Sequence, residues 1–372
     1  MNKTKVVYIV SEIDKALGFE WIAQAIDKTK IELVFFLIGK RNTELAAQLT
    51  VEGVRVYEFP FSGKSDAPWI FINVIIRLLQ IRPQVIHTHL FYANLIGLTA
   101  GWLTWVPKRI YTRHHAMVHY DEYPKGLKWD KYCNIMATHI IAISNNVKNI
   151  LIDKDKARPE KIYIIHHGFK LPYFQNVDAE RIRHLNEKYR INSQHFPVVG
   201  VISRYLKLKG IQYILPAFKK LKEKYPHAHL ILVNTQGNYS NSIRTLLLEL
   251  EPDSFTEIGF EYDLIALYKL FDVFVHVPVD AQSEAFGQTY VESLASGIPS
   301  VFTLSGVAPE FVVHERNALV VPFCDAENIY QSMMRILTDA DLRKNLVMNG
   351  RDSATLFPLG KMINQLEQIY QS

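Results

Sequence analysis

The feature that most constrains the fold is the alternation of short runs rich in β-branched residues with longer amphipathic runs. In the first half, the short runs are Lys5–Val10, Glu32–Ile38, Val54–Phe59, Val85–His89, Arg109–Arg113, Ile140–Ser144 and Ile162–His166. Helical patterns such as Gly18–Asp27, Trp69–Ile81 and Lys125–Ala137 lie between them. Strands that alternate with helices indicate an α/β fold, in which a parallel sheet is covered on both faces.

A second series of the same kind begins at Pro197, after a charged stretch in which Asp178–Tyr189 predicts a surface helix. Its strands are expected at Val198–Ser203, His229–Asn234, Phe255–Ile258, Val273–Val277, Ser300–Thr303 and Ala318–Val321. The chain has 372 residues, more than twice the length of a typical domain of about 150 residues. We therefore predict two Rossmann-like, doubly wound parallel-sheet domains, at 1–175 and 195–356. Open α/β sheets bind ligands beyond the carboxyl ends of their strands, so the two sheets are expected to face a shared cleft.

Composition excludes several classes of protein. Hydrophobic residues make up 48% and charged residues 21%, which fits a globular chain and not extended disorder. The longest apolar runs are shorter than the roughly 20 residues of a membrane-spanning helix. Acidic residues follow the first apolar run at Glu12 and Asp14, unlike in a signal peptide. Cys133 and Cys324 lie far apart in the sequence, so free thiols in a reducing, cytoplasmic compartment are expected.

The positive charge is concentrated in the first half of the chain. Residues 1–175 contain 23 Lys and Arg against 15 Asp and Glu, whereas the remainder contains 19 against 22. Aromatic and basic residues mix in the segment Tyr123–Tyr132. Two interpretations stay open: a solvated basic face, or contact with an anionic membrane surface or a lipid-linked acceptor on the inner face of the membrane. No nucleic-acid partner is expected.

The segment Ser283–Val301 carries the clearest chemical signal. Glu284 and Glu292 lie eight positions apart, and Gly287 between them suits a tight turn into a helix that starts near Gln288. The free N–H groups at Gly287, Gln288, Thr289 and Tyr290 would form a phosphate cradle. A cradle flanked by two carboxylates predicts a nucleotide-sugar site, because the carboxylates accept hydrogen bonds from sugar hydroxyls. The alternative is a solvated helix residue at Glu292 and a cap at Glu284.

This segment resembles the donor-binding motif of retaining GT-B glycosyltransferases, specifically glycosyltransferase family 4, the group 1 glycosyl transferases. The matching residues are Glu284, Phe286, Gly287, Glu292, Ala295, Gly297 and Pro299. Upstream, Val199–Phe218 resembles the strand, arginine loop, Lys-Gly pair and helix of that family. The departures are a single glycine at Gly18, Asn234 in place of a glycine, Ser305 in place of another, and a longer loop over Val277–Ser283.

The resemblance implies a role for each matched residue. Glu292 would bind the ribose hydroxyls and Glu284 the hydroxyls of the donor hexose, with Phe286, Gly287, Gln288 and Thr289 completing the donor site. Arg204 and Lys209 would stabilise the departing diphosphate, so no metal or other cofactor is expected. A basic pair at the carboxyl end of a strand suits this task on physical grounds as well.

The N-terminal half resembles the family more loosely, through His87–Gly97, Tyr111–His115 and Ala142–Val147. His114 aligns with a histidine that lies near the donor sugar in the family, although neighbouring His115 is an alternative and a structural histidine is another. A zinc site at these histidines is not favoured, because the sequence shows no carboxylate or cysteine beside them. The last segment, 357–372, resembles the helix that crosses back to the N-terminal domain.

The sequence therefore predicts a retaining, metal-independent hexosyltransferase. Its donor would be a UDP-, GDP- or ADP-sugar and its acceptor a glycan or a lipid-linked molecule, in surface polysaccharide or glycolipid biosynthesis. The C-terminal domain would hold the donor and the N-terminal domain the acceptor. Two alternatives remain: another nucleotide-sugar enzyme on the same scaffold, such as an epimerase, and a non-catalytic nucleotide-sugar-binding subunit.

Overall fold

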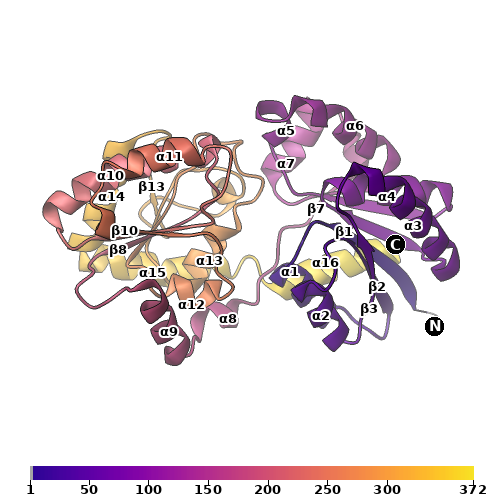
Figure 1. Cartoon of the computed structure of the whole chain (residues 1–372), viewed down its shortest axis with the longest axis horizontal. Coiled ribbons are helices and arrows are strands. Elements are labelled where there is room, and N and C mark those ends of the chain that lie inside the picture. The colour runs from indigo at the N-terminus through magenta and orange to yellow at the C-terminus, as the bar shows by residue number, and fades with distance from the viewer. Residues whose placement is uncertain (1–2) are drawn as a thin grey trace. The chain divides into compact units, whose positions relative to one another are not determined.

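The computed structural model describes residues 3–372 and divides the chain into two compact units (Figure 1). Unit 1 holds the described residues up to Phe169 together with Phe357–Ser372, and unit 2 holds Lys170–Leu356. The stretch 170–194, treated above as lying largely between the domains, belongs to unit 2. Its helix α9 (Ala179–Tyr189) packs on α12 (Leu264–Tyr268), and both Nε and Nη2 of Arg181 donate to the carboxylate of Asp263, at 2.8 and 2.6 Å.

Unit 1 contains a seven-stranded sheet in the order β3-β2-β1-β4-β5-β6-β7, and every neighbouring pair is parallel. The strands are β1 (Thr4–Ser11), β2 (Ile31–Gly39), β3 (Arg55–Pro60), β4 (Val85–His89), β5 (Lys108–Arg113), β6 (His139–Ala142) and β7 (Ile162–Ile164). The interior strand β1 is buried along most of its length, as expected for a strand covered on both faces.

Helices flank this sheet on both faces (Figure 1). They are α1 (Leu17–Ala25), α2 (Glu44–Val51), α3 (Ala67–Ile81), α4 (Phe91–Leu103), α5 (Val118–Asp121), α6 (Leu127–Met136), α7 (Asn145–Asn149) and α16 (Leu359–Gln371). Helix α3 is apolar on two sides: it buries Ile70, Val74 and Leu78, and it exposes Trp69, Ile72, Ile76 and Leu79. This second face makes α3 an unusually apolar surface helix.

The last helix, α16, belongs to unit 1 although it ends the chain. It contacts α1 and β1, and in Figure 1 its yellow ribbon lies beside the indigo α1. The buried Tyr370 hydroxyl makes hydrogen bonds with the hydroxyl of Tyr8 and with Nδ1 of His87, the latter at 2.7 Å. These buried polar contacts fasten α16 to the sheet.

Unit 2 contains a six-stranded parallel sheet in the order β10-β9-β8-β11-β12-β13. Its strands are β8 (Val198–Ile202), β9 (His229–Val233), β10 (Phe255–Ile258), β11 (Val273–His276), β12 (Ser300–Phe302) and β13 (Leu319–Val320). Besides α9 and α12, its helices are α8 (Leu171–Gln175), α10 (Ile211–Lys224), α11 (Ser240–Leu247), α13 (Gln288–Ser296), α14 (Ala326–Thr338) and α15 (Ala340–Ala354).

The predicted fold class is confirmed: both units are parallel α/β sheets, and each predicted strand ends within two residues of an observed one. The backbone explains why Asn234 can replace the glycine of the family pattern, since this residue has a φ of +65°. Glycine and asparagine tolerate that conformation best. Within residues 3–372, no helix is long and apolar enough to cross a membrane, and both cysteines are free.

Candidate active site

The turn into α13 has the geometry that the sequence predicts. Gly287 is the N-cap of the helix with a φ of +83°, and a Cβ there would lie 2.5 Å from the ring of Tyr290. Gly306 has a φ of +62°, and its Cβ would lie 2.7 Å from the Cβ of Glu284. Only glycine fits these two positions without displacing a neighbour. They allow the loops after β11 and β12 to pack closely around Glu284.

Glu284 is buried and stands between two nitrogen groups of unit 2. Its Oε1 lies 2.5 Å from Nζ of Lys209 and 3.1 Å from Nε2 of His276, and its backbone N–H donates to the hydroxyl of Ser305 at 3.0 Å. Burial opposes the ionisation of Glu284, but Lys209 and His276 outweigh it and hold its pKa at about 2. Glu284 is therefore an ionised carboxylate in a fixed orientation.

Glu292 has a raised pKa, in contrast to Glu284. It is buried within α13, and its Oε2 accepts a hydrogen bond from the hydroxyl of Tyr268 at 2.9 Å. Burial raises the pKa of Glu292 to about 7, against the smaller lowering effect of Tyr268. Two carboxylates whose environments move their pKa values apart are a mark of a functional site.

The two basic candidates follow β8, but only one of them reaches Glu284. Lys209 ends the short 3-10 helix Lys207–Lys209, and Gly210 behind it has a φ of +77°. A Cβ on Gly210 would lie 1.8 Å from the carbonyl oxygen of Val277, so glycine is required where this turn meets the end of β11. Arg204 is exposed, and its guanidinium makes no hydrogen bond or ion pair within residues 3–372. It is free to meet an anion.

Several buried hydroxyls in these loops lack a partner within residues 3–372. They are Oγ of Ser203 after β8, Oγ of Ser283 beside Glu284, and Oγ1 of Thr289 in the first turn of α13. Buried polar groups are nearly always hydrogen-bonded in folded proteins. Unpaired hydroxyls after β8, beside Glu284 and in the first turn of α13 indicate a place where a polar ligand completes the hydrogen bonding. Phe286 in the loop is buried, and Gln288, the first residue of α13, is exposed.

His114 and His115 point to different neighbours within unit 1. Nε2 of His114 lies 3.0 Å from Nδ1 of His89, and its ring stacks on His167 with centroids 5.7 Å apart. Burial, together with the neighbouring histidines, places the pKa of His114 well below its usual range, so this imidazole is neutral. His115 instead contacts Asp130, with Nε2 to Oδ2 at 3.2 Å.

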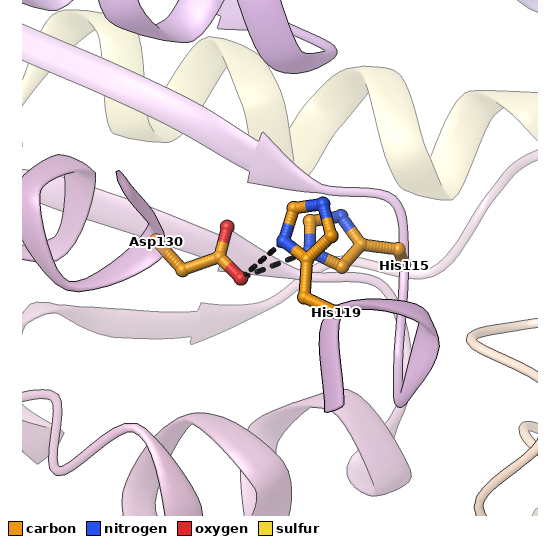
Figure 2. A group of neighbouring side chains, drawn as sticks. All are labelled: His115, His119 and Asp130. Atoms are coloured by element: carbon orange, nitrogen blue, oxygen red, sulfur yellow. Dashed lines mark hydrogen bonds and ion pairs between the residues drawn. The ribbon is translucent and has the colours of Figure 1, made fainter. Parts of the chain in front are cut away.

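Sequence reasoning missed His276, His119 and Asp130. His276 ends β11, and a polar residue that closes an otherwise apolar strand just before the Glu284 loop was an available signal. Nδ1 of His119 lies 2.6 Å from Oδ2 of Asp130, beside His115 (Figure 2). The premise that no carboxylate lies beside the histidines is therefore wrong for His115. Asp130 comes 15 residues after His115, too far for a local motif to reveal it.

Two Asp-x-Asp triplets, at 153–155 and 339–341, bear on whether the donor site holds a metal. Such a triplet is the usual way for a glycosyltransferase to hold a metal at a diphosphate. In unit 1, Oδ2 of Asp155 lies 3.3 Å from Nη2 of Arg113. In unit 2, the side chain of Asp339 caps α15 by accepting from the backbone N–H of Leu342 at 2.9 Å. One carboxylate of each triplet thus has a structural role.

Comparison with known proteins identifies the family. The model described as "Glycosyl transferases group 1" matches residues 185–353, and that described as "Glycosyltransferase Family 4" matches residues 22–171. A capsular polysaccharide biosynthesis glycosyltransferase, CapM of Staphylococcus aureus, is 28% identical over 294 residues, which are 75% of this chain and 74% of CapM. A D-inositol 3-phosphate glycosyltransferase of Corynebacterium kroppenstedtii is 22% identical and covers 86% of this chain and 75% of its own length.

Among solved structures, HepE of Anabaena with UDP and glucose superposes with a TM-score of 0.84 at 19% identity, over 99% of both chains. A glycosyltransferase of Rickettsia africae gives a TM-score of 0.78 at 23% identity, over 100% of this chain and 98% of its own. At these identities the structures establish the fold, while the two family models between them match most of the sequence. The chain therefore belongs to glycosyltransferase family 4, the group 1 glycosyl transferases, and has their GT-B fold.

Proposed function

We propose that this chain is a retaining, metal-independent glycosyltransferase that moves a hexose-type sugar from a nucleotide-diphosphate sugar to a glycan or lipid-linked acceptor. The observation that carries the proposal is the pair of buried carboxylates, one before α13 and one within it. Glu284 is ionised and oriented by Lys209 and His276, whereas Glu292 accepts a hydrogen bond from Tyr268 and has a pKa of about 7. Unpaired hydroxyls in the surrounding loops are ready for a polar ligand.

Each residue takes the role that its environment suits. The carboxylate of Glu284 accepts hydrogen bonds from the hexose hydroxyls, and Glu292 accepts them from the ribose. Arg204, the ammonium of Lys209 and the N–H groups that begin α13 meet the charge that develops on the departing diphosphate. Oriented donors of this kind stabilise the transition state without a metal ion.

The acceptor hydroxyl attacks the donor sugar from the face of the leaving group, and a phosphate oxygen takes its proton. No carboxylate is needed as a general base in this mechanism. His114 is the residue of unit 1 that the family resemblance assigns to the donor. As a neutral imidazole it would contribute a hydrogen bond and no charge.

The relatives support a nucleotide sugar as the donor. HepE was crystallised with UDP-glucose, and a related mannosyltransferase of Mycobacterium tuberculosis is GDP-mannose-dependent. The similarity to CapM supports a role in surface polysaccharide biosynthesis. UDP- and GDP-hexoses are therefore the first donors to test, followed by ADP-sugars.

We propose a peripheral position on an anionic membrane. The helices α3, α4 and α6 contact one another in sequence along unit 1 and expose large apolar side chains, among them Trp69, Trp102 and Trp129. Lys125 and Lys128 lie exposed beside Trp129. A mixed aromatic and basic surface is attracted to anionic lipid headgroups.

A panel of labelled UDP-, GDP- and ADP-sugars tests the function. Transfer or hydrolysis supports a glycosyltransferase, and loss of both in Glu284→Gln connects the activity to this site. Formation of an epimer would favour the alternative enzyme; a UDP-GlcNAc 2-epimerase of Neisseria meningitidis shares the fold at a TM-score of 0.65 and 13% identity. Binding without any turnover would point to a non-catalytic subunit.

A further inference from the structure

A second cluster of polar side chains lies in unit 1, in the segment after β5. His115 follows the end of that strand, His119 lies one helical turn further along in α5, and Asp130 lies in α6. Figure 2 shows both imidazole rings directed at the same carboxylate oxygen. One ligand atom of each residue lies within 4.8 Å of the other two. The three come from separate elements that the fold brings together.

The cluster is held in place from behind. Nη1 of Arg113 lies 2.7 Å from Oδ1 of Asp130, so the guanidinium orients the carboxylate and leaves Oδ2 for the two imidazoles. The ring of His119 packs against the backbone of Gly126, where an added Cβ would lie 2.6 Å from the ring. The exposed fractions of the His115, His119 and Asp130 side chains are 27%, 13% and 7%. The site is thus built from ordered groups and is still open to solvent on the His115 side.

The charges around the cluster are unbalanced. Arg113 is buried between Asp130 and Asp155, with Nη1 2.7 Å from the first carboxylate and Nη2 3.3 Å from the second. With both imidazoles neutral, as metal ligation requires, one guanidinium faces two carboxylates, and the hydroxyl of Tyr120 donates to the second of them at 2.6 Å. In that state the buried network carries one excess negative charge. Buried charge is costly unless it is compensated. A cation at His115, His119 and Asp130 would supply the missing positive charge.

We propose that Nε2 of His115, Nδ1 of His119 and Oδ2 of Asp130 bind a divalent transition-metal ion of the zinc type. Two imidazoles and a carboxylate are a donor set that zinc accepts, with water in the fourth position. Zinc ligands lie about 2.0–2.2 Å from the ion, so ligand atoms at the tetrahedral angle are about 3.4 Å apart. The observed separations from Oδ2, 3.2 Å to His115 and 2.6 Å to His119, need to widen by less than 1 Å.

The ion would join the segment after β5 to α6. Because His114 immediately precedes His115, the metal would also fix the backbone that positions His114. Arg113 would serve as the outer partner that orients a metal-bound carboxylate. None of its ligands is a residue of the donor site proposed for unit 2, and the proposal does not rest on the proposed transferase activity.

The test is metal binding by the full chain after dialysis against a chelator. Co²⁺ is added and followed by its visible d–d absorption, and Zn²⁺ binding is measured by calorimetry and by the rise in melting temperature that a native-state ligand causes. We expect one ion per chain. His119→Asn keeps a hydrogen-bond donor toward Asp130 but is a poor zinc ligand, so it should weaken Zn²⁺ binding at least about a hundredfold, beyond the 10–100-fold typical of losing an outer partner.

His115→Asn is a second variant at the more exposed ligand, and His139→Ala, on β6 outside the cluster, is the control for unspecific binding to histidine. The proposal is supported if the wild type and His139→Ala bind Zn²⁺ alike while both Asn variants lose binding yet melt like the metal-free wild type. If the wild type shows neither a Co²⁺ spectrum nor Zn²⁺ binding at millimolar metal, or if the Asn variants bind as tightly as it does, the site is a hydrogen-bonded His-Asp cluster only.

Discussion

Replacing Lys209 by Met removes the cation beside Glu284 while keeping a side chain of similar length. The ion pair is nearly enclosed: its atoms are 2.5 Å apart, and the exposed fractions of the two side chains are 15% and 8%. Breaking a buried ion pair from one side destabilises a protein by about 3–5 kcal/mol, because the remaining charge is left without compensation. We expect a loss of this size in the free energy of unfolding of unit 2.

The pKa of Glu284 gives an independent value for the stabilisation that its two partners provide. A pKa of about 2 lies about 2.5 units below its ordinary 4.5, which corresponds to about 3 kcal/mol, shared between Lys209 and His276. Because this pKa is lowered on folding, the stabilisation is present above pH 4.5 and is lost as the pH falls toward 2. The difference in stability between wild type and variant should therefore be largest at neutral pH and shrink on acidification.

Thermal unfolding at several pH values measures this effect. A loss of 3 kcal/mol lowers the melting temperature by roughly 6–12 °C for a unit of this size. Lys207→Met, an exposed lysine in the same turn, is the matched control and should change stability by less than about 0.5 kcal/mol. The double variant Lys209→Met/Glu284→Gln should recover much of the loss, because no buried charge remains. The reasoning fails if Lys209→Met melts like Lys207→Met, or if the double variant loses the sum of both single effects.

Four further predictions concern the site and the surface. Glu292→Gln should weaken binding of the free nucleotide by about 1.5–3 kcal/mol, the value of a charge-assisted hydrogen bond. Glu284→Gln should spare binding of the free nucleotide and weaken binding of the nucleotide sugar. Calorimetry with both ligands tests these roles, and equal behaviour of the two variants would contradict them. Since the pKa of Glu292 is raised to about 7, nucleotide affinity should increase between pH 6 and pH 8 as the carboxylate forms, and Glu292→Gln should abolish that increase. The same raised pKa means that Glu292 lowers the stability of the free protein as the pH rises from 4.5, the ordinary pKa of Glu, through 7. Lys209→Ala should lower turnover by about a hundredfold with a smaller effect on donor affinity. Donor affinity should be equal in EDTA and in Mn²⁺, and an affinity that requires Mn²⁺ would overturn the metal-free mechanism. Turnover that falls in EDTA at unchanged affinity would point to the proposed ion of unit 1. Vesicles with anionic lipid should co-sediment the protein in a salt-sensitive manner, and Lys125→Ala/Lys128→Ala should reduce binding; insensitivity to lipid charge and to salt would exclude the membrane proposal.

The sequence alone determined the architecture because the relevant signals are local. Burial on both faces favours continuous apolar strands such as Val198–Ile202, which ends where its apolar run ends. Gly287 and Gly210 are the kind of turn residue that a sequence can reveal, because positive φ values favour a residue without a Cβ. The Glu284 and Glu292 spacing could be recognised for a similar reason: loop, turn and helix follow one another within a few residues.

The charge states of these groups and the contacts between them depend on the tertiary fold. The opposite states of Glu284 and Glu292 depend on Lys209, His276 and Tyr268, which different strands and loops bring to the two carboxylates. His115 and Asp130 could not be paired from the sequence, since their contact depends on how the segment after β5 folds back on α6. Periodicity along a chain reports which side of an element is buried; the pKa of a carboxylate, or its ability to hold a metal, depends on charges that only folding brings within a few ångströms.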